Sequence, residues 1–229
     1  MTAQRSNKYQ LLAVYSQIWL WLISAGFIIA MALLGPLNPD EREHAYASLL
    51  VSEGEIPYID FFEHHHPLLW YMASPVLWLM KENADAWYVL RTMQAFLLFI
   101  TCIYVYKITL LTGVKKIAAY IAVLTYLSID IVRFYGLQIR PDNLMICLFM
   151  SGLYYYCRYR RQNQRKDLIL SFELFTLSFF SLQKAPLLFA LPCLYLLKKS
   201  IKNQKILTDM IYASILPIIT LLIPFVFLL

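Results

Sequence analysis

The sequence alternates between long apolar blocks and short polar connections. A helix needs about 20 mostly apolar residues to cross the hydrocarbon core of a bilayer, and shorter blocks must borrow flanking residues or thin the bilayer locally. We therefore predict an all-α integral membrane protein with about seven transmembrane helices. The predicted spans cover residues 11–34, 86–111, 117–136, 142–157, 168–182, 185–198 and 207–229.

Two further segments predict helices that do not cross the membrane. The apolar block PLLWYMASPVLWLM, residues 67–80, is short and contains two prolines, which favours an interfacial helix. The polar stretch NPDEREHAYASLLVSEGE predicts another short helix. Asp40 is its expected N-cap, Glu43 completes a capping box and Gly54 ends the helix.

The charges of the connections predict the orientation. With residues 67–80 left out of the membrane and a cytoplasmic N-terminus, fourteen of the 20 basic residues fall on the inner side, as the positive-inside rule requires. Eleven of the 14 acidic residues and all 4 histidines then face outward. We predict a multi-pass protein of the cytoplasmic membrane with an extracytoplasmic active face. Residues 35–85 form its first outer loop, within a single membrane domain of residues 1–229.

Composition narrows the class of protein. Hydrophobic residues make up 60% of the chain and charged residues 15%, whereas about a quarter of the residues in soluble domains are charged. The net charge of +6 comes from short clusters between apolar blocks. It forms no basic face interleaved with aromatic residues, so nucleic acid is not an expected partner. The four cysteines lie inside apolar blocks without CxxC spacing and are interpreted as core residues.

The run FFEHHHPLLWY places Glu63, His64, His65 and His66 side by side. One interpretation is a solvated polar turn at the membrane surface, and the other is a metal or phosphate site. Imidazole and carboxylate groups suit zinc or a similar ion. Three consecutive histidines cannot all point at one ion, so at most two of them, with Glu63 or a distant partner, would ligate. The candidates for a divalent metal are Glu63, His64 and His65.

Ionisable residues also gather where predicted spans meet on the outer side. The segment SIDIVRFYGLQIRPDN holds Asp130, Arg133, Arg140 and Asp142, and the turn SLQKAP holds Lys184. Charges near membrane depth are costly and are functional candidates by default. Each alone is also explained by snorkelling to the interface. Together, beside an acidic loop, they predict a polar cavity.

These segments resemble the GT-C glycosyltransferases. The stretch NPDEREHAYASLLVSEGEIPYIDFFEHHHPLLWY is similar to the first extracytoplasmic loop of the bacterial members akin to protein O-mannosyltransferases and lipid A aminoarabinose transferase. The shared pattern is an acidic pair after the first span, a short helix, and an aromatic-acidic segment leading through a proline into an interfacial helix. RPDN and LQKAP fall where that family carries a second acidic residue and a lysine-containing turn. The similarity runs over essentially the whole chain.

The resemblance implies a role for each matching residue. Asp40 matches the catalytic base, Glu41 its neighbour and Asp142 the second acidic position. Glu63 matches a loop carboxylate near a metal ion in some relatives. Lys184 matches a lysine near the lipid phosphate.

The resemblance also implies the reaction and the donor. It predicts inverting transfer of a sugar from a polyprenyl-phosphate donor in the bilayer to an extracytoplasmic glycan, lipid or protein. No glycine-rich nucleotide loop appears, in agreement with a lipid-linked donor. Relatives usually carry further spans, so the chain is expected to hold their N-terminal seven-span core. The candidates for holding the donor phosphate are Arg133, Arg140, Lys184 and His66, which replaces a lysine of the aminoarabinose relatives.

Two alternatives stay open at this point. One is a non-catalytic remnant or partner subunit that keeps the core without the acceptor end. The other is a small transporter subunit, which would carry charges near mid-span and matching discontinuous helices. Glu173 is the main buried-looking charge, we expect it toward the inner side, and the sequence has no internal repeat.

Overall fold

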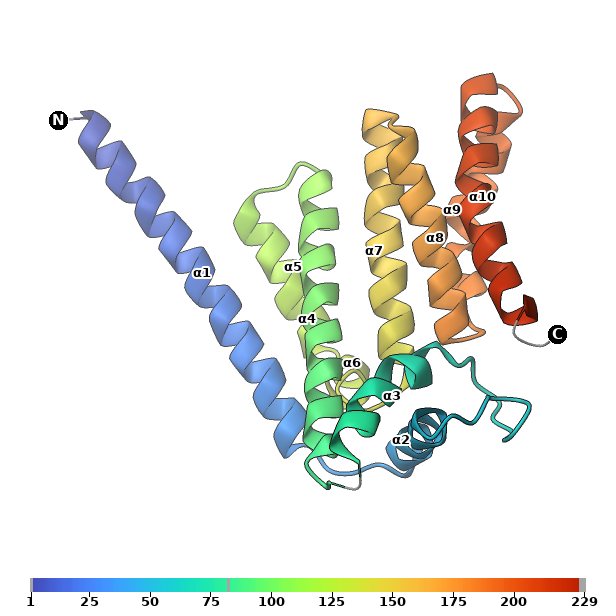
Figure 1. Ribbon diagram of the computed structural model, residues 1–229. Helices are drawn as coiled ribbons and strands as arrows, with labels where there is room; N and C mark the ends of the chain where they lie inside the picture. The colour runs from blue at the N-terminus through green and yellow to red at the C-terminus, as the bar shows by residue number, and fades with distance from the viewer. Residues whose placement is uncertain (1, 82, 227–229) are drawn as a thin grey trace.

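The computed structural model describes residues 2–81 and 83–226, and in this part the chain forms ten helices and no strands (Figure 1). The helices are α1 (Thr2–Leu34), α2 (Pro39–Ser52), α3 (Leu68–Met80), α4 (Ala86–Leu111), α5 (Lys116–Ser128), α6 (Asp130–Tyr135), α7 (Pro141–Gln162), α8 (Arg165–Ser181), α9 (Ala185–Ser200) and α10 (Gln204–Val226).

The helices α1, α4, α5 and α7 to α10 run lengthwise through the molecule, while α2, α3 and α6 gather at one end (Figure 1). Three of the seven are long and apolar enough by themselves to cross a membrane, over Gln17–Leu34, Ala86–Leu111 and Gln204–Leu222. This confirms the predicted all-α membrane class. The count of seven spans stays a prediction, because α5, α7, α8 and α9 are shorter or more polar.

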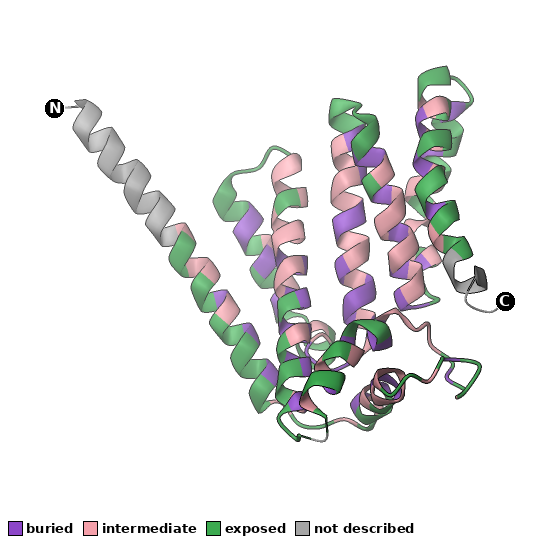
Figure 2. Ribbon diagram, in the orientation of Figure 1, coloured by how far each residue is buried: buried purple, intermediate pink, exposed green. Residues whose placement is uncertain are grey.

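The outward faces of the lengthwise helices are apolar, as contact with lipid requires. Figure 2 shows exposed positions along α1 and α10. Ile23 on α1 is 66% exposed, Leu191 on α9 75% and Ile211 on α10 60%. Exposing many large apolar side chains to water is unfavourable, because each of them loses the free energy of burial. They are favourable in hydrocarbon.

The outer-end helices cover the junction of α4 with α7. Leu69 and Trp70 of α3 are fully buried and pack in one cluster with Leu97 of α4 and Leu144 of α7. Burial of a large apolar side chain contributes about 1.5–3 kcal/mol. This packing fixes the first outer loop against the start of α7, which positions the site described below.

The N-terminus of α2 differs from the prediction. The N-cap is Asn38, not Asp40: its side chain accepts a hydrogen bond from the N–H of Asp40 at 3.1 Å. The N–H of Asn38 donates in turn to Glu41 at 3.3 Å, so Glu41 completes the capping box in place of Glu43. The shift by two residues leaves the carboxylate of Asp40 free to point away from the helix end. Gly54 follows the helix at φ +98°, as expected for a helix stop.

The predicted span 117–136 is also interrupted. Its helix α5 ends at Ser128, and Ile129 has extended backbone angles, φ −69° and ψ 121°. The short helix α6 then turns away and lies with α2 and α3 at the end of the molecule (Figure 1). Hydropathy cannot register this break, because the residues on both sides of it are apolar.

Candidate active site at the outer end of the helices

Arg140 brings two predicted catalytic carboxylates together. It precedes α7 in extended conformation, and its guanidinium forms an ion pair with Asp40 of α2. Its Nε lies 3.4 Å from Oδ2 of Asp142, in the first turn of α7, and the guanidinium lies over the ring of Tyr135 at 4.9 Å. The side chain of Arg140 is 20% exposed, whereas those of Asp40 and Asp142 are 47% and 37% exposed. A largely enclosed cation therefore stands between two carboxylates that solutes can reach.

A buried ion pair holds this arrangement in place. Glu41 is completely buried and binds Arg91 of α4 through both carboxylate oxygens, at 2.6 and 3.0 Å. The same carboxylate accepts a hydrogen bond from the N–H of Ile139 at 3.2 Å. Asp40 directly precedes Glu41, and Arg140 directly follows Ile139. The carboxylate of Glu41 thus holds the backbone next to Asp40 and the backbone next to Arg140.

The rest of the Arg91 guanidinium ties this network to the end of α1. It donates to the carbonyl oxygens of Ala32 at 3.1 Å, Gly35 at 2.6 Å and Pro36 at 2.7 Å. Arginine suits this position because its rigid fork of donors can satisfy a carboxylate and several carbonyls at once. The geometry gives Glu41 a positioning role, since its oxygens are occupied by the protein itself.

Arg140 and Asp142 also line a cavity of about 370 Å³ between α5, α6 and α7. Its other walls are mostly apolar and aromatic, and they include Tyr126, Ile131, Val132, Tyr135, Met145 and Ile146. A cation in the lining of a mostly apolar cavity suits an amphipathic molecule with an anionic headgroup. The cavity is within the usual size range of ligand sites, about 300–1,000 Å³.

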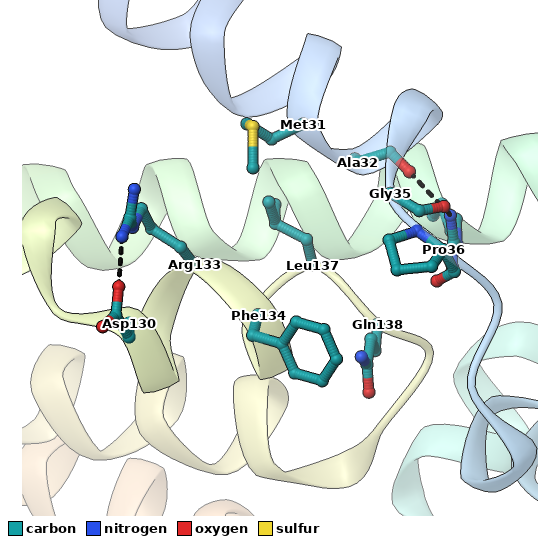
Figure 3. Close-up of a pocket in the computed structure, with 10 residues that line it drawn as sticks. Met31, Ala32, Gly35, Pro36, Asp130, Arg133, Phe134, Leu137 and Gln138 are labelled. Carbon is teal, nitrogen blue, oxygen red and sulfur yellow. Dashed lines mark hydrogen bonds and ion pairs between the residues drawn. The ribbon is translucent and has the colours of Figure 1, made fainter.

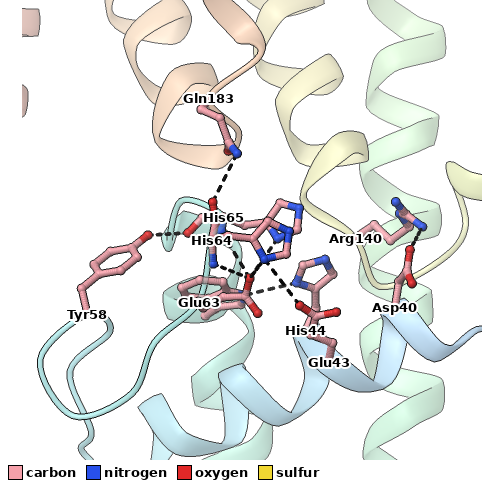
Figure 4. A network of polar contacts seen from close by, with 10 residues as sticks. Asp40, Glu43, His44, Tyr58, Glu63, His64, His65, Arg140 and Gln183 are labelled. Atoms are coloured by element: carbon pink, nitrogen blue, oxygen red, sulfur yellow. Dashed lines mark hydrogen bonds and ion pairs between the residues drawn. The ribbon is translucent and has the colours of Figure 1, made fainter.

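A second polar cluster lies beside the first (Figure 4). One ligand atom from each of Glu43, Glu63, His64 and His65 lies within 4.8 Å of the others. Nδ1 of His64 is 2.8 Å and Nδ1 of His65 is 3.1 Å from the same oxygen of Glu63. The structure thus gathers the three residues predicted from the EHHH run and adds Glu43 from α2. Two imidazoles and two carboxylates are a suitable donor set for zinc or a similar divalent ion.

The two carboxylates of this cluster crowd each other. A hydrogen bond with Glu63 raises the pKa of Glu43, and burial and the negative charge of Glu63 add to this effect. Burial also opposes ionisation of Glu63, but hydrogen bonds from Glu43, His65 and two backbone N–H groups lower its pKa to about 2. A proton shared between the carboxylates therefore relieves their repulsion. A divalent cation would relieve it more strongly, and the residues present fit one.

His44 sits behind the cluster and stays neutral. It is 1% exposed, and Trp70 donates a hydrogen bond to its Nδ1 at 3.4 Å. Its ring packs edge-on against His65 at 4.9 Å between ring centres. Burial, aided by the nearby His65, lowers the pKa of His44 from 6.5 to about 4.

The lowered pKa of His44 predicts a pH-dependent stability. Between about pH 6.5 and 4 the unfolded chain binds a proton at this residue that the folded chain does not, so the free energy of unfolding falls as the pH falls. The loss is on the order of 2–3 kcal/mol across this window. His44→Gln keeps an acceptor for Trp70 and should flatten this part of the dependence. Melting temperatures from pH 7.5 to 4.5 test this, and equal slopes for both proteins would contradict it.

The other residues predicted to bind the donor phosphate have different partners from Arg140. Arg133 forms an ion pair with Asp130 on α6 and lines a separate cavity (Figure 3). Nδ1 of His66 donates to the carbonyl oxygen of Phe179 at 2.5 Å, which anchors the loop to the end of α8.

Lys184 is exposed at the start of α9. Its neighbour Gln183 donates to the carbonyl oxygen of His64 at 3.2 Å (Figure 4). The turn between α8 and α9 therefore faces the first outer loop. Of the residues predicted to bind the donor phosphate, Arg140 is the one that contacts Asp40 in the part of the chain that the structure describes.

Glu173 lies at the middle of α8, not toward its inner end as expected. Its Oε1 accepts a hydrogen bond from Thr220 of α10 at 2.8 Å, so this carboxylate links two helices. Among the described residues, the Asp40–Arg140 pair and the cluster of Glu43, Glu63, His64 and His65 lie at the α2–α3 end of the helices.

Together, the fold and the site define a multi-pass membrane protein with an acidic and cationic site at one end of its helices. Residues 64–227 match the model of the dolichyl-phosphate-mannose-protein mannosyltransferase family. The chain belongs to this family of membrane glycosyltransferases that use a lipid-linked sugar donor, which confirms the GT-C resemblance. Comparisons with curated proteins and with solved structures give no match.

The family match contains Arg140, Asp142 and Lys184 but begins after Asp40 and Glu41. The ion pair between Asp40 and Arg140, and the bond from Glu41 to Ile139, join the first outer loop to the matched part. Asp40 itself lies outside the matched residues.

Proposed function

We propose that this protein transfers a sugar from a polyprenyl-phosphate donor to an extracytoplasmic acceptor with inversion at the anomeric carbon. The observation that carries the proposal is the pairing of reachable Asp40 with Arg140, which lines a mostly apolar cavity. In the proposed orientation the N-terminus is in the cytoplasm, the protein lies in the cytoplasmic membrane, and this end faces outward. The acceptor is a glycan, a lipid or a protein.

Arg140 is suited to hold the donor phosphate. It is the cation of the cavity whose Ile131, Val132 and Ile146 side chains can receive the first isoprene units. Guanidinium groups bind phosphate oxygens in pairs of charge-assisted hydrogen bonds. Lys184, His66 and Arg133 are secondary candidates for this role.

Asp40 is suited to act as the base. Without substrate it is paired with Arg140, and a donor phosphate on Arg140 would compete for that guanidinium and release the carboxylate. Asp40 then takes the proton of the acceptor hydroxyl while the acceptor oxygen attacks the anomeric carbon. The bond between that carbon and the phosphate oxygen breaks, and its electrons leave with the polyprenyl phosphate. Arg140 offsets the growing charge on the departing phosphate, and Asp142 keeps the guanidinium oriented.

A divalent ion bound by Glu43, Glu63, His64 and His65 would add positive charge beside the donor phosphate. We expect purified protein to contain a stoichiometric divalent metal, and His64→Ala/His65→Ala to lose it. His66→Ala is the matched control, because the ring of His66 is bound to α8 and should leave the metal in place. Elemental analysis measures this directly. Absence of metal from the unaltered protein would remove the ion from the proposal.

The test of the function is transfer in vitro. The purified protein, reconstituted in lipid, is supplied with synthetic polyprenyl-phosphate sugars and with glycan, lipid and peptide acceptors. The proposal expects acceptor-dependent release of polyprenyl phosphate from at least one donor. Binding of donors without transfer to any acceptor would instead favour a non-catalytic partner subunit.

A further inference from the structure

The end of α7 to α10 that lies opposite α2 and α3 carries an exposed positive charge (Figure 1). Asp167 and Asp209 are the acidic side chains at this end, and each is only 1% exposed. Asp209 binds Arg165 at 2.7 Å and Lys205 at 2.9 Å, and Asp167 lies 3.5 Å from Arg158. Six further cations are exposed and form no ion pair with the residues that the structure describes: Arg160, Arg161, Lys166, Lys198, Lys199 and Lys202.

Two of these unpaired cations meet at one aromatic ring. The guanidinium of Arg160, on α7, lies 4.4 Å from the ring centre of Tyr195 on α9 and donates a hydrogen bond to its hydroxyl at 3.1 Å. Nζ of Lys199 lies 5.8 Å from the same ring centre. A ring attracts cations without neutralising them. Both side chains therefore keep N–H donors with which to form charge-assisted hydrogen bonds to a phosphate.

The surface of α9 below these cations is apolar. Leu187, Leu191 and Leu194 are each more than half exposed, and their spacing by four and three residues places them on one face of the helix. Lys198 follows Leu194 by four residues on the same face, in the last turn of α9. This face therefore changes within one turn from leucines to lysines, as a helix does where it passes from acyl chains to lipid headgroups.

We propose that this end of α7 and α9 binds the headgroup of an anionic phospholipid, such as phosphatidylglycerol. The lipid phosphate accepts hydrogen bonds from Arg160 and Lys199, and the acyl chains lie along Leu194 and Leu191. The neighbouring unpaired cations favour a headgroup with a net negative charge over one that carries its own cation.

The lipid site is separate from the proposed donor site. Arg160 and Lys199 lie at one end of the helices, whereas the Asp40–Arg140 pair lies at the α2–α3 end. The inference goes beyond sugar transfer and stands whether or not the protein catalyses it.

The experiment compares two lipids with the same phosphate and the same acyl chains. Purified protein is titrated with phosphatidylglycerol or phosphatidylcholine, and bound lipid is counted by native mass spectrometry. Each basic side chain beside an anionic lipid contributes about a fivefold gain in affinity, so two predict about a 25-fold preference for phosphatidylglycerol. The preference should shrink as the salt concentration rises, because salt screens exposed charges. Equal binding of both lipids by the unaltered protein would overturn the proposal.

Variants locate the site. Arg160→Gln/Lys199→Gln should lose most of the preference, and Lys199→Gln alone should lose about fivefold. The matched control, Arg42→Gln/Lys81→Gln, removes the same charge from exposed residues at the α2–α3 end and should bind like the unaltered protein. An unchanged preference in the first variant, or an equal loss in the control, would overturn the assignment to Arg160 and Lys199.

Inorganic phosphate separates a lipid site from a free-anion site. It offers the same oxygens to Arg160 and Lys199 but has no acyl chains for the leucines of α9. Millimolar phosphate should therefore fail to displace phosphatidylglycerol at equal ionic strength. Displacement would mean that the cations bind a free anion, and the lipid proposal would be wrong. Sugar transfer is not measured in this experiment, so neither result bears on the donor site at Arg140.

Discussion

Asp40→Asn is expected to lower the rate of sugar transfer by about 10²–10⁴-fold, the usual effect of removing a general base. Asparagine has nearly the same shape and keeps an oxygen that can accept from Arg140, so the pairing with α7 survives. It cannot take a proton from the acceptor hydroxyl. Donor binding should therefore change little while the maximal rate falls. Initial rates at several donor concentrations, with protein reconstituted in lipid, separate the two effects.

The matched control for Asp40 is Asp85→Asn. Asp85 is an exposed aspartate of the same outer loop, and its side chain makes no capping bond to α4. This variant should transfer sugar at the unaltered rate. Full activity of Asp40→Asn, with its melting temperature unchanged, would remove Asp40 from the role of base.

Arg91→Met is expected to destabilise the protein by about 3–5 kcal/mol, because it leaves the carboxylate of Glu41 buried without its partner. It also leaves three carbonyl oxygens at the end of α1 without their hydrogen-bond donor. The melting temperature in detergent measures the loss. Arg42→Met is the control: Arg42 is the exposed neighbour of Glu41 on α2, and its replacement should have little effect.

Removing both partners separates a positioning role from a purely structural one. Arg91→Met with Glu41→Leu should lose less stability than the sum of the single changes, since no unpaired charge stays buried. The donor KM should still rise, because the segment carrying Arg140 is no longer held by the Glu41–Ile139 bond. Additive losses, or a normal KM in the folded double variant, would contradict the role assigned to Glu41.

The broad architecture and part of the site follow from local sequence. Each lengthwise helix comes from one apolar block, and α3 from a block too short to cross. The gathering of Glu63 with His64 and His65 was predictable because the three are consecutive in the chain. The nearness of Asp40 to Arg140, a hundred residues later, was expected only in outline, from the shared side of the membrane and the family resemblance.

Other features depend on tertiary contacts that no local pattern records. Arg91 lies inside the predicted span 86–111, and an arginine within an apolar block is a signal for a buried partner, but the sequence does not say which residue that partner is. Glu43 is free to join the cluster of Glu63, His64 and His65 because Glu41, and not Glu43, completes the capping box of α2. The break at Ile129 separates two cavities, and apolar residues on both sides conceal it.

The anomeric configuration of the product tests the central claim most directly. That claim is a single displacement in which Asp40 takes the proton of the acceptor and Arg140 holds the leaving phosphate. NMR of product made from a donor of one defined anomer should show the opposite anomer. A product that retains the configuration of the donor would require a second displacement and would contradict this assignment of the site.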